Sequence, residues 1–242
     1  MLYQPKNDVS IVYESNDDIE HARSTIPSYL KEVYYWAYLN PRNARLLDRE
    51  CVVNTILWGN SKRLRRAVLT EVVKGSNVLQ AAHVYGNLIP ELAEKIGADG
   101  SLDVIDIAPL QVFLCKRKLK NYSNSNVRIA NASILDSKQY DLVNCFFLLH
   151  EVPDCLKAKI INTLLSQVAP GGKAIFVDYN KPHKWHPLHY LMLFIFRCFE
   201  PFAESLFDND IKNMAVSTSN FRWQKRTIFG GLYQIINATR ST

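Results

Sequence analysis

The sequence contains no apolar stretch of about 20 residues, the length that a membrane-spanning helix requires. The apolar run Tyr190–Phe196 is only seven residues long and is followed by Arg197. The first 20 residues are acidic and lack an apolar segment, so we expect neither a signal peptide nor a transit peptide there. The net charge of +6 comes without an arginine-rich run or a nucleic-acid-binding motif. We therefore expect no nucleic-acid partner and assign the basic excess to an anionic membrane face.

Cysteine is present in an odd number, five, and no two cysteines have C-x-x-C spacing. This pattern predicts reduced, mostly buried thiols in a cytosolic type of compartment rather than disulfides. The 242 residues are 48% hydrophobic and 21% charged, which is typical of one globular domain with a full core. We expect a polar tail and a helical extension over residues 1–74, packed on a main domain over residues 75–242.

Capping residues and aromatic clusters predict three helices before residue 75. Asn40 and Pro41 form an N-cap followed by a first-turn proline, and Gly59 ends the same helix. The five aromatic residues of the first helix either line an apolar entrance to a substrate site or pack on the main domain. The three expected helices span Ser28–Leu39, Pro41–Trp58 and Ser61–Val73.

Residues 76–180 alternate between short apolar runs and helical patterns, as in a parallel α/β sheet. The expected strands are Asn77–Ala82, Leu102–Ile107, Val127–Ala130, Asp141–Leu149 and Lys173–Tyr179. The expected helices between them are Asn87–Ile96, Pro109–Tyr122 and Asp154–Val168. Gly230–Gly231 separates two more strand-forming runs, Phe221–Phe229 and Leu232–Ala238, which predicts a closing hairpin. The expected sheet therefore has seven strands.

The ends of the first two predicted strands carry a cofactor-binding pattern. Gly86 ends the turn after the first strand, and Asp106 lies at the end of the second strand, twenty residues later. This is the layout that seats an adenosine, with an acid for the ribose hydroxyls. The absence of G-x-G-x-x-G favours S-adenosylmethionine (SAM) over a dinucleotide. We predict an α/β, Rossmann-like fold of the class I SAM-dependent methyltransferase type, with an N-terminal helical extension.

The cofactor turn departs from the methyltransferase pattern E-x-G-x-G-x-G. Gln80, Ala82, Val84 and Gly86 stand at its four defined positions, so only the last glycine remains. Because glycine allows close backbone approach and positive φ, the side chains at 84 and 85 should change how the methionine end of SAM lies. Ligands bind outside the carboxyl ends of parallel strands. The expected cofactor-binding residues are Gln80, Ala82, Val84, Tyr85, Gly86, Asp106, Ile107, Asn131, Ala132 and Phe147.

Seven segments carry a specific combination of residues. They read YLNPRNARLLDRE (38–50), TILWG (55–59), VLQAAHVYG (78–86), DVIDIAPLQV (103–112), CFFLLHEVPD (145–154), VDYNKPHKWHPL (177–188) and FGGLYQ (229–234). Together they resemble the RquA family, the methyltransferase-like proteins of rhodoquinone biosynthesis. The resemblance implies that SAM donates an amino group, that ubiquinone is the substrate and that a ring methoxy group is replaced by an amine. It also implies a requirement for a divalent metal, manganese, and it makes the altered turn a family trait.

That reaction needs an unprotonated amine, a stabilised ring oxyanion and help for methanol to leave. The candidate catalytic residues are His150 and Glu151 after the fourth predicted strand, Asp178 and Tyr179 at the end of the fifth, and Tyr233 past the Gly-Gly turn. His150 is alternatively a packed or helix-capping histidine. Glu151 alternatively caps the next helix, where its charge meets the positive end of the dipole.

Three histidines, His183, His186 and His189, follow the fifth predicted strand at spacings of three. Pro182 and Pro187 indicate a loop there, in which two of the imidazoles are able to share a metal ion. Three surface histidines near a membrane are the alternative interpretation. The sequence therefore leaves the metal ligands unassigned.

The segment at about residues 181–216 is expected to face a membrane or a quinone. Its apolar run Tyr190–Phe196 suits a helix that rests in the membrane interface or covers an apolar pocket, and a core helix is the alternative. The helix Ser61–Val73 carries a basic cluster that contacts lipid phosphates or faces solvent. This cluster consists of Lys62, Arg63, Arg65 and Arg66. The expected location is peripheral, on the inner face of a bacterial cytoplasmic membrane or the matrix side of a mitochondrial inner membrane.

Two other functions compete with amino transfer. The first is conventional SAM-dependent methylation of a quinone, against which the glycines missing at positions 82 and 84 count. The second is a non-catalytic SAM-binding or lipid-binding protein, against which the polar groups retained at four strand ends count.

Overall fold

Seven strands form one mixed sheet, and the model that describes it is a computed structural model covering residues 26–216 and 218–242. The strands are β1 (Asn77–Ala81), β2 (Ser101–Asp106), β3 (Ser125–Ile129), β4 (Tyr140–Phe146), β5 (Val168–Tyr179), β6 (Phe221–Ile228) and β7 (Tyr233–Arg240). Their order is β3-β2-β1-β4-β5-β7-β6. Strands β1 to β5 are parallel, whereas β7 runs antiparallel to both β5 and β6. The predicted seven-stranded α/β architecture and the closing hairpin are confirmed.

Helices cover both faces of the sheet because its central strands are apolar on both sides. Along β1, for example, Val78 packs into the core on one face and Leu79 into the core on the other. The helices that contribute to the first core are α5 (Ser61–Leu69), α6 (Leu88–Ile96) and α7 (Pro109–Lys118). Helix α8 (Asp154–Ser166) packs in the second.

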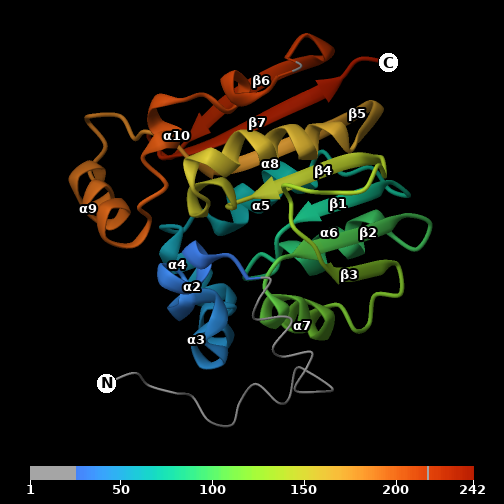
Figure 1. Ribbon diagram of the computed structural model, residues 1–242, viewed down its shortest axis with the longest axis horizontal. Helices are drawn as coiled ribbons and strands as arrows, with labels where there is room; N and C mark the ends of the chain where they lie inside the picture. Colours follow the sequence, from blue (N-terminus) through green and yellow to red (C-terminus); the bar gives the residue numbers. More distant parts are fainter. Residues whose placement is uncertain (1–25, 217) are drawn as a thin grey trace.

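The carboxyl ends of the parallel strands point towards the N-terminal helices and α9 (His189–Phe199), as the arrowheads in Figure 1 show. The N-terminal helices are α2 (Ser28–Glu32), the π-helical turn η1 (Tyr35–Leu39), α3 (Pro41–Leu47) and α4 (Glu50–Ile56). They pack on the main domain through a small apolar cluster that joins Ile26, Leu30 and Tyr34 to Ala108. The edge of the sheet where ligands bind in this architecture is therefore covered by other parts of the chain.

Two of the predicted N-terminal helices are broken, which corrects the sequence analysis. The helix expected over 28–39 breaks at Tyr34, whose side chain is buried and reaches across to Glu200. The helix expected over 41–58 breaks at Asp48, whose carboxylate accepts a hydrogen bond from the main-domain turn. In both places a contact with the main domain outweighs local helix propensity. The predicted start at Asn40 is confirmed, because its side chain accepts hydrogen bonds from Arg42 N and Asn43 N.

The other differences concern element ends. Strand β5 begins at Val168 rather than at Lys173, so the expected Gly171–Gly172 turn lies within the strand, beside a register shift in its pairing with β4. Strand β4 ends at Phe146, and Leu149–Glu151 forms a 3-10 turn (η2) instead of continuing it. Helices α5, α7 and α8 end two to four residues before the predicted positions, as their bounds above state.

Helix α9 has one buried and one exposed apolar face. Met192 and Phe196 lie in the core, whereas Tyr190 is 82% exposed and Phe194 is 61% exposed. The core interpretation therefore holds for one face, and the other face is free to contact an apolar partner. After α9 the chain forms α10 (Ser205–Asp208), η3 (Ile211–Met214) and η4 (Thr218–Asn220). Among the described residues, no helix has the length and apolarity needed to cross a bilayer.

All five cysteines are free, but the prediction of mostly buried thiols is wrong. Cys115 and Cys145 are buried, whereas Cys51, Cys155 and Cys198 are exposed. The three exposed cysteines lie on the outward faces of α4, α8 and α9. The predictions made for residues 1–23 fall outside the described residues.

The two faces of α9 predict different responses to substitution. Phe196→Ala should lower the free energy of unfolding by about 3–5 kcal/mol, because it removes a ring that is 0% exposed. Phe194→Ser, the matched change on the outward face, should alter it by less than about 0.5 kcal/mol. Urea denaturation followed by tryptophan fluorescence measures both. Equal losses would mean that the whole helix belongs to the core.

Candidate active site

A cavity of about 220 Å³ lies at the carboxyl ends of β1, β2 and β4, beneath α2, η1 and α4. Eleven of the predicted site residues line it, drawn from both the cofactor set and the catalytic set. They are Ala82, Val84, Tyr85, Asp106, Ile107, Asn131, Ala132, Phe147, His150, Glu151 and Tyr179. Gln80, Gly86, Asp178 and Tyr233 do not line it. The carboxyl ends of the strands thus bring together most of the residues expected from the sequence.

The turn after β1 keeps a glycine-like backbone without its glycines. Ala82 has φ 67°, in the left-handed region that favours glycine, and Gly86 has φ 81°. Gln80 is fully buried below the turn, where its Nε2 donates to the carbonyls of Ala81 and Ala82 at 3.0 Å each. Its Oε1 accepts from Asn144 Nδ2 at 2.5 Å. Gln80 therefore holds the turn from inside the sheet, and a direct contact with the cofactor stays a prediction.

The last part of the turn is held by carboxylates of the N-terminal extension. Gly86 N donates to Asp48 Oδ1 at 3.0 Å, and Asn87 N donates to Glu50 Oε2 at 3.1 Å. Lys118 Nζ lies 2.5 Å from the same Asp48 oxygen and donates to Gly86 O at 2.9 Å. The positive φ favours glycine at position 86, and a Cβ there would lie 2.7 Å from Glu50 Oε2, so a larger residue would also push the Glu50 carboxylate away from Asn87 N. The two amides that immediately precede α6 are thus occupied by the chain's own acids.

Arg65 does not belong to an exposed basic cluster, which corrects the sequence analysis. It is buried between two carboxylates, with an ion pair to Glu50 and a 2.9 Å ion pair from Nε to Glu91 Oε2. Its role is to fix the loop that carries Glu50. The other three cations of the predicted cluster, Lys62, Arg63 and Arg66, are exposed.

Tyr85 joins the turn to η1. Its hydroxyl donates to Ala37 O at 2.7 Å, and its ring stacks on Tyr38 with a centroid distance of 5.6 Å. Gln111 Nε2 donates to Tyr38 O at 2.7 Å, and Gln111 Oε1 lies 2.8 Å from His83 Nδ1. Burial lowers the pKa of His83 to about 3, with the Lys118 charge acting in the same direction, so this imidazole is neutral. The turn and the extension therefore form one continuous wall of the cavity.

Asp106 lies where the ribose-binding acid is expected. Its Oδ2 accepts from His83 N and its Oδ1 accepts from Ala108 N, both at 2.8 Å. Burial raises the pKa of this carboxyl to about 6, against the opposing effect of these backbone amides. Each carboxylate oxygen retains acceptor capacity towards the cavity. Ile107, Asn131 and Ala132 line the same end.

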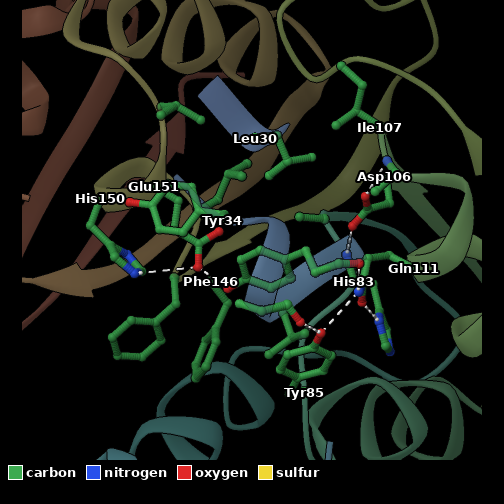
Figure 2. Close-up of a pocket in the computed structure, with 18 of the residues that line it drawn as sticks. Leu30, Tyr34, His83, Tyr85, Asp106, Ile107, Gln111, Phe146, His150 and Glu151 are labelled. Atoms are coloured by element: carbon green, nitrogen blue, oxygen red, sulfur yellow. Dashed lines mark hydrogen bonds and ion pairs between the residues drawn. The ribbon is translucent and has the colours of Figure 1, made fainter. Parts of the chain in front are cut away.

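A second polar cluster occupies the other end of the cavity, around His150 (Figure 2). Asp178 Oδ1 lies 2.8 Å from His150 Nδ1 and accepts from Tyr179 N at 2.7 Å. Asp178 Oδ2 accepts from Leu149 N at 2.9 Å and from His150 N at 3.3 Å. Burial alone would lower the pKa of His150, but the charge and hydrogen bond of Asp178, with Glu200 and Glu151, raise it to about 9. At neutral pH this imidazole is therefore protonated.

Glu151 and Glu200 approach the free ring nitrogen of His150. Glu151 Oε1 lies 3.6 Å and Glu200 Oε2 lies 3.8 Å from His150 Nε2. Tyr38 donates a hydrogen bond to Glu151, and Tyr34 donates to Glu200 at 2.9 Å. Burial raises the pKa of both carboxyl groups, and the charge of His150 opposes the rise.

Sequence reasoning missed Glu200, Tyr34 and Tyr38 as site residues. Tyr34 and Tyr38 stand four residues apart among the noted aromatics, a spacing that puts both on one helix face. Glu200 gives no local signal, because it follows α9 and meets His150 only through the tertiary fold.

Tyr233 and the three loop histidines lie outside the cavity. The Tyr233 hydroxyl is buried without a hydrogen-bond partner among the described residues, and its ring packs on Phe147 and Tyr179. His186 packs edge-on against Phe229, and the His183 backbone N donates to Gly230 O at 2.9 Å. Within residues 26–216 and 218–242, no three His, Cys, Asp or Glu side chains are arranged to hold a metal ion. The metal ligands, which the sequence left open, therefore stay unassigned.

The fold is that of class I SAM-dependent methyltransferases. An O-methyltransferase family protein from Burkholderia thailandensis superposes with a TM-score of 0.63 at 14% identity, covering 93% of this chain and 69% of that one. A SAM-dependent methyltransferase from Aquifex aeolicus gives a TM-score of 0.55 at 17% identity, covering 83% of this chain and 98% of that one.

Residues 52–226 match the ubiE/COQ5 methyltransferase family, and the chain belongs to that family. The ubiquinone/menaquinone biosynthesis C-methyltransferase UbiE of Idiomarina loihiensis is 28% identical over 116 residues, which is 46% of this chain and 45% of that protein. The demethylmenaquinone methyltransferase of Listeria welshimeri is 24% identical over 119 residues, 48% of this chain and 50% of that protein. The chain thus spans about half the length of the curated relatives it matches. Membership of the RquA family stays a prediction.

The raised pKa of His150 predicts that the protein loses stability as the pH rises. Because this pKa moves from 6.5 to about 9 on folding, its stabilisation is complete below pH 6.5 and disappears as the pH passes through 9. The raised pKa of Glu151 acts in the same direction. Urea denaturation across this range should give a falling free energy of unfolding. In Asp178→Asn the free energy of unfolding should depend less on pH, whereas in His183→Gln it should fall with pH as in the parent protein. If the free energy of unfolding of the wild-type protein does not change between pH 6.5 and 9, the raised pKa of His150 is contradicted.

Proposed function

We propose that this protein uses SAM to replace a methoxy group on the ring of ubiquinone by an amino group, yielding rhodoquinone. Membership of the ubiE/COQ5 family supports SAM as the co-substrate, and the relatives' names support a quinone as the acceptor. The observation that carries the proposal is one cavity with Asp106 at one end and the His150 cluster at the other. This arrangement suits a reaction in which the amino-acid end of SAM must meet both a base and an acid.

The first step joins nitrogen to the ring. In its ionised form Glu151 is a stronger base than an ordinary carboxylate, because its pKa is raised; it accepts a proton from the donor's α-ammonium group, and the free amine attacks the ring carbon that bears methoxy. A C–N bond forms and the C–O bond breaks. The protonated His150, held by Asp178, gives its Nε2 proton to the departing methoxide, which leaves as methanol, and His150 then takes up the second proton that the ring-bound nitrogen loses.

The second step frees the nitrogen from its original carbon. Loss of the proton on that α-carbon forms a C=N bond and moves an electron pair into the quinone ring, which becomes a quinol. Water then hydrolyses the C=N bond, so that the amine stays on the ring and the rest of the donor leaves as a 2-oxo acid. Atoms and electrons balance with water as the only further reactant, because the quinone itself is the oxidant; the product released is therefore rhodoquinone in its reduced, quinol form.

No step is assigned to manganese, because the described residues contain no arrangement of three ligands for it. The requirement implied by the resemblance is tested in the same assay, with and without added Mn²⁺ and after treatment with a chelator.

Conventional C-methylation of a quinone is the second candidate, and the names of the relatives favour it. Against it stand the residues at the cofactor turn. Ala82 and Val84 replace glycines of the usual pattern, and the amides of Gly86 and Asn87 already hold Asp48 and Glu50. A turn changed in this way favours a position of the methionine end of SAM that differs from its position on the usual glycine-rich turn.

Incubation with SAM and a short-chain ubiquinone, followed by mass spectrometry, should give a product with amino in place of methoxy, together with methanol. His150→Gln should reduce the rate by at least about a hundredfold, because general acid–base catalysis contributes that much. His183→Gln, outside the cavity, is the matched control and should keep the parent rate. A quinone that gains a methyl group would establish the second candidate instead. If the quinone does not change, a non-catalytic binding role gains support.

We also propose that the protein binds the surface of a membrane, since its quinone substrate is held in the bilayer. The exposed side chains Tyr190, Leu191 and Phe194 on α9, with Trp185 at 96% exposure, would enter the interface. The cations Lys62, Arg63 and Arg66 would contribute about 1 kcal/mol each near anionic lipid.

Liposome flotation tests the membrane proposal. The double variant Leu191→Ser with Phe194→Ser should float less and should lose more activity on a long-tailed quinone than on a short-chain one. Ile134→Ser, also at an exposed apolar position, is the control and should float like the parent. Binding that is the same for neutral and anionic vesicles at every salt concentration would remove the electrostatic contribution.

A further inference from the structure

The cavity carries three acidic side chains and one basic group, His150. Asp106 lies at one end, whereas Glu151 and Glu200 lie at the other, beside His150. No lysine or arginine is among the residues that line the cavity in the described part of the chain. The electrostatics of this space therefore favour a ligand that carries positive charge over one that carries negative charge.

The carboxylates exceed the cation that they surround. Asp178, Glu151 and Glu200 all lie near one imidazolium, His150, and the described residues provide no second cation within ion-pair distance of the two glutamates. Burial raises the pKa of both glutamates, that of Glu151 to about 8, although the hydrogen bonds from Tyr38 and Tyr34 oppose the rise. Without a second cation nearby, Glu151 is therefore mostly protonated at neutral pH. Buried carboxylates without enough cationic partners are costly, and a cationic ligand removes that cost.

An independent observation marks the point at which a ligand fits. His150 is 4% exposed and lines the cavity, and its Nδ1 is taken by Asp178. Its Nε2 makes no hydrogen bond within the described residues, because Glu151 and Glu200 stand 3.6 and 3.8 Å away. Figure 2 shows His150 and Glu151 together on the side of the cavity opposite Asp106. Because this imidazole is protonated, Nε2 is an N–H donor, and a donor without an acceptor in hydrogen-bond range indicates that a ligand atom with a lone pair, such as the methoxy oxygen of the proposed substrate, belongs beside it.

We propose that Glu151 and Glu200 form a binding subsite for a primary ammonium group, with Glu200 as its previously unassigned member. The proposal rests on the proposed function, since the ammonium group is then the α-ammonium of SAM. A primary ammonium has three N–H donors, which suit two carboxylates. A divalent metal requires more ligands than these side chains provide among the described residues.

The cofactor turn directs the same end of SAM to this subsite. The amides of Gly86 and Asn87 at the start of α6 attract a carboxylate, and Asp48 and Glu50 already occupy them. These two amides are therefore closed to the donor's α-carboxylate. With Asp106 at the ribose, its amino-acid end extends towards Glu200 instead. This pose sets the α-nitrogen between the carboxyl groups of Glu151 and Glu200.

Calorimetric titration with two ligands tests the subsite without requiring turnover. The ligands are S-adenosylhomocysteine (SAH) and its analogue with hydrogen in place of the α-amino group. Glu200→Gln should weaken SAH at least about tenfold and the deamino analogue less than about twofold, because only SAH has the charge-assisted bond to lose. Glu204→Gln, an exposed acid in the same segment, is the matched control and should change neither affinity.

Each other outcome overturns the proposal. Equal weakening of both ligands would make Glu200 a structural residue, and unchanged SAH affinity would remove it from the site. Tight binding of Mn²⁺ alone that Glu200→Gln abolishes would make this a metal site. If Glu200→Gln fails to fold by circular dichroism, Glu200→Asp replaces it, with the same selective loss expected. The two proposals are tested separately. If Glu200→Gln does not weaken SAH selectively, the ammonium subsite is wrong, but the amination assay can still give an aminated quinone. If SAH binding is weakened selectively but no aminated quinone forms, only the proposed reaction is refuted.

Discussion

The carboxylate of Asp178 is the interaction on which the rest of the site depends. It accepts hydrogen bonds from the backbone of Leu149, His150 and Tyr179 and meets His150 Nδ1 at 2.8 Å. One buried acid thereby joins the end of β5 to the turn after β4 and fixes both the orientation and the charge of the imidazole. Because that charge draws in Glu151 and Glu200, the polar end of the cavity assembles around a single residue that does not itself line it.

The N-terminal extension completes the site rather than merely covering it. Tyr34 and Tyr38 hold the two glutamates, while Asp48 and Glu50 hold the turn that opens α6. The turn has lost the glycines at 82 and 84, yet Ala82 still takes a left-handed backbone. The backbone flexibility that glycines would give this turn is thus absent, and side-chain contacts hold the turn in one conformation. In physical terms this makes a cofactor pose that differs from the common one reasonable.

The sequence predicts most of the architecture, because strand periodicity and the spacing from Gly86 to Asp106 are local signals. It also predicts His150, Asp178 and Asp106 at one edge of the sheet, since the carboxyl ends of parallel strands share that edge. It does not predict Glu200, whose partner lies fifty residues away, or the burial of Arg65 between Glu50 and Glu91. The breaks at Tyr34 and Asp48 are missed for the same reason: contacts with the main domain, which no local pattern records, decide them.

The central claim is that the amino end of SAM, and not its methyl group, meets the quinone. The most direct measurement uses SAM with heavy nitrogen in the α-amino group and heavy carbon in the methyl group. After incubation with ubiquinone, mass spectrometry follows both labels. The account predicts a quinone product that carries the heavy nitrogen and no heavy methyl carbon, with the 2-oxo acid retaining the labelled methyl group. A product that carries the heavy methyl carbon and no heavy nitrogen would contradict it.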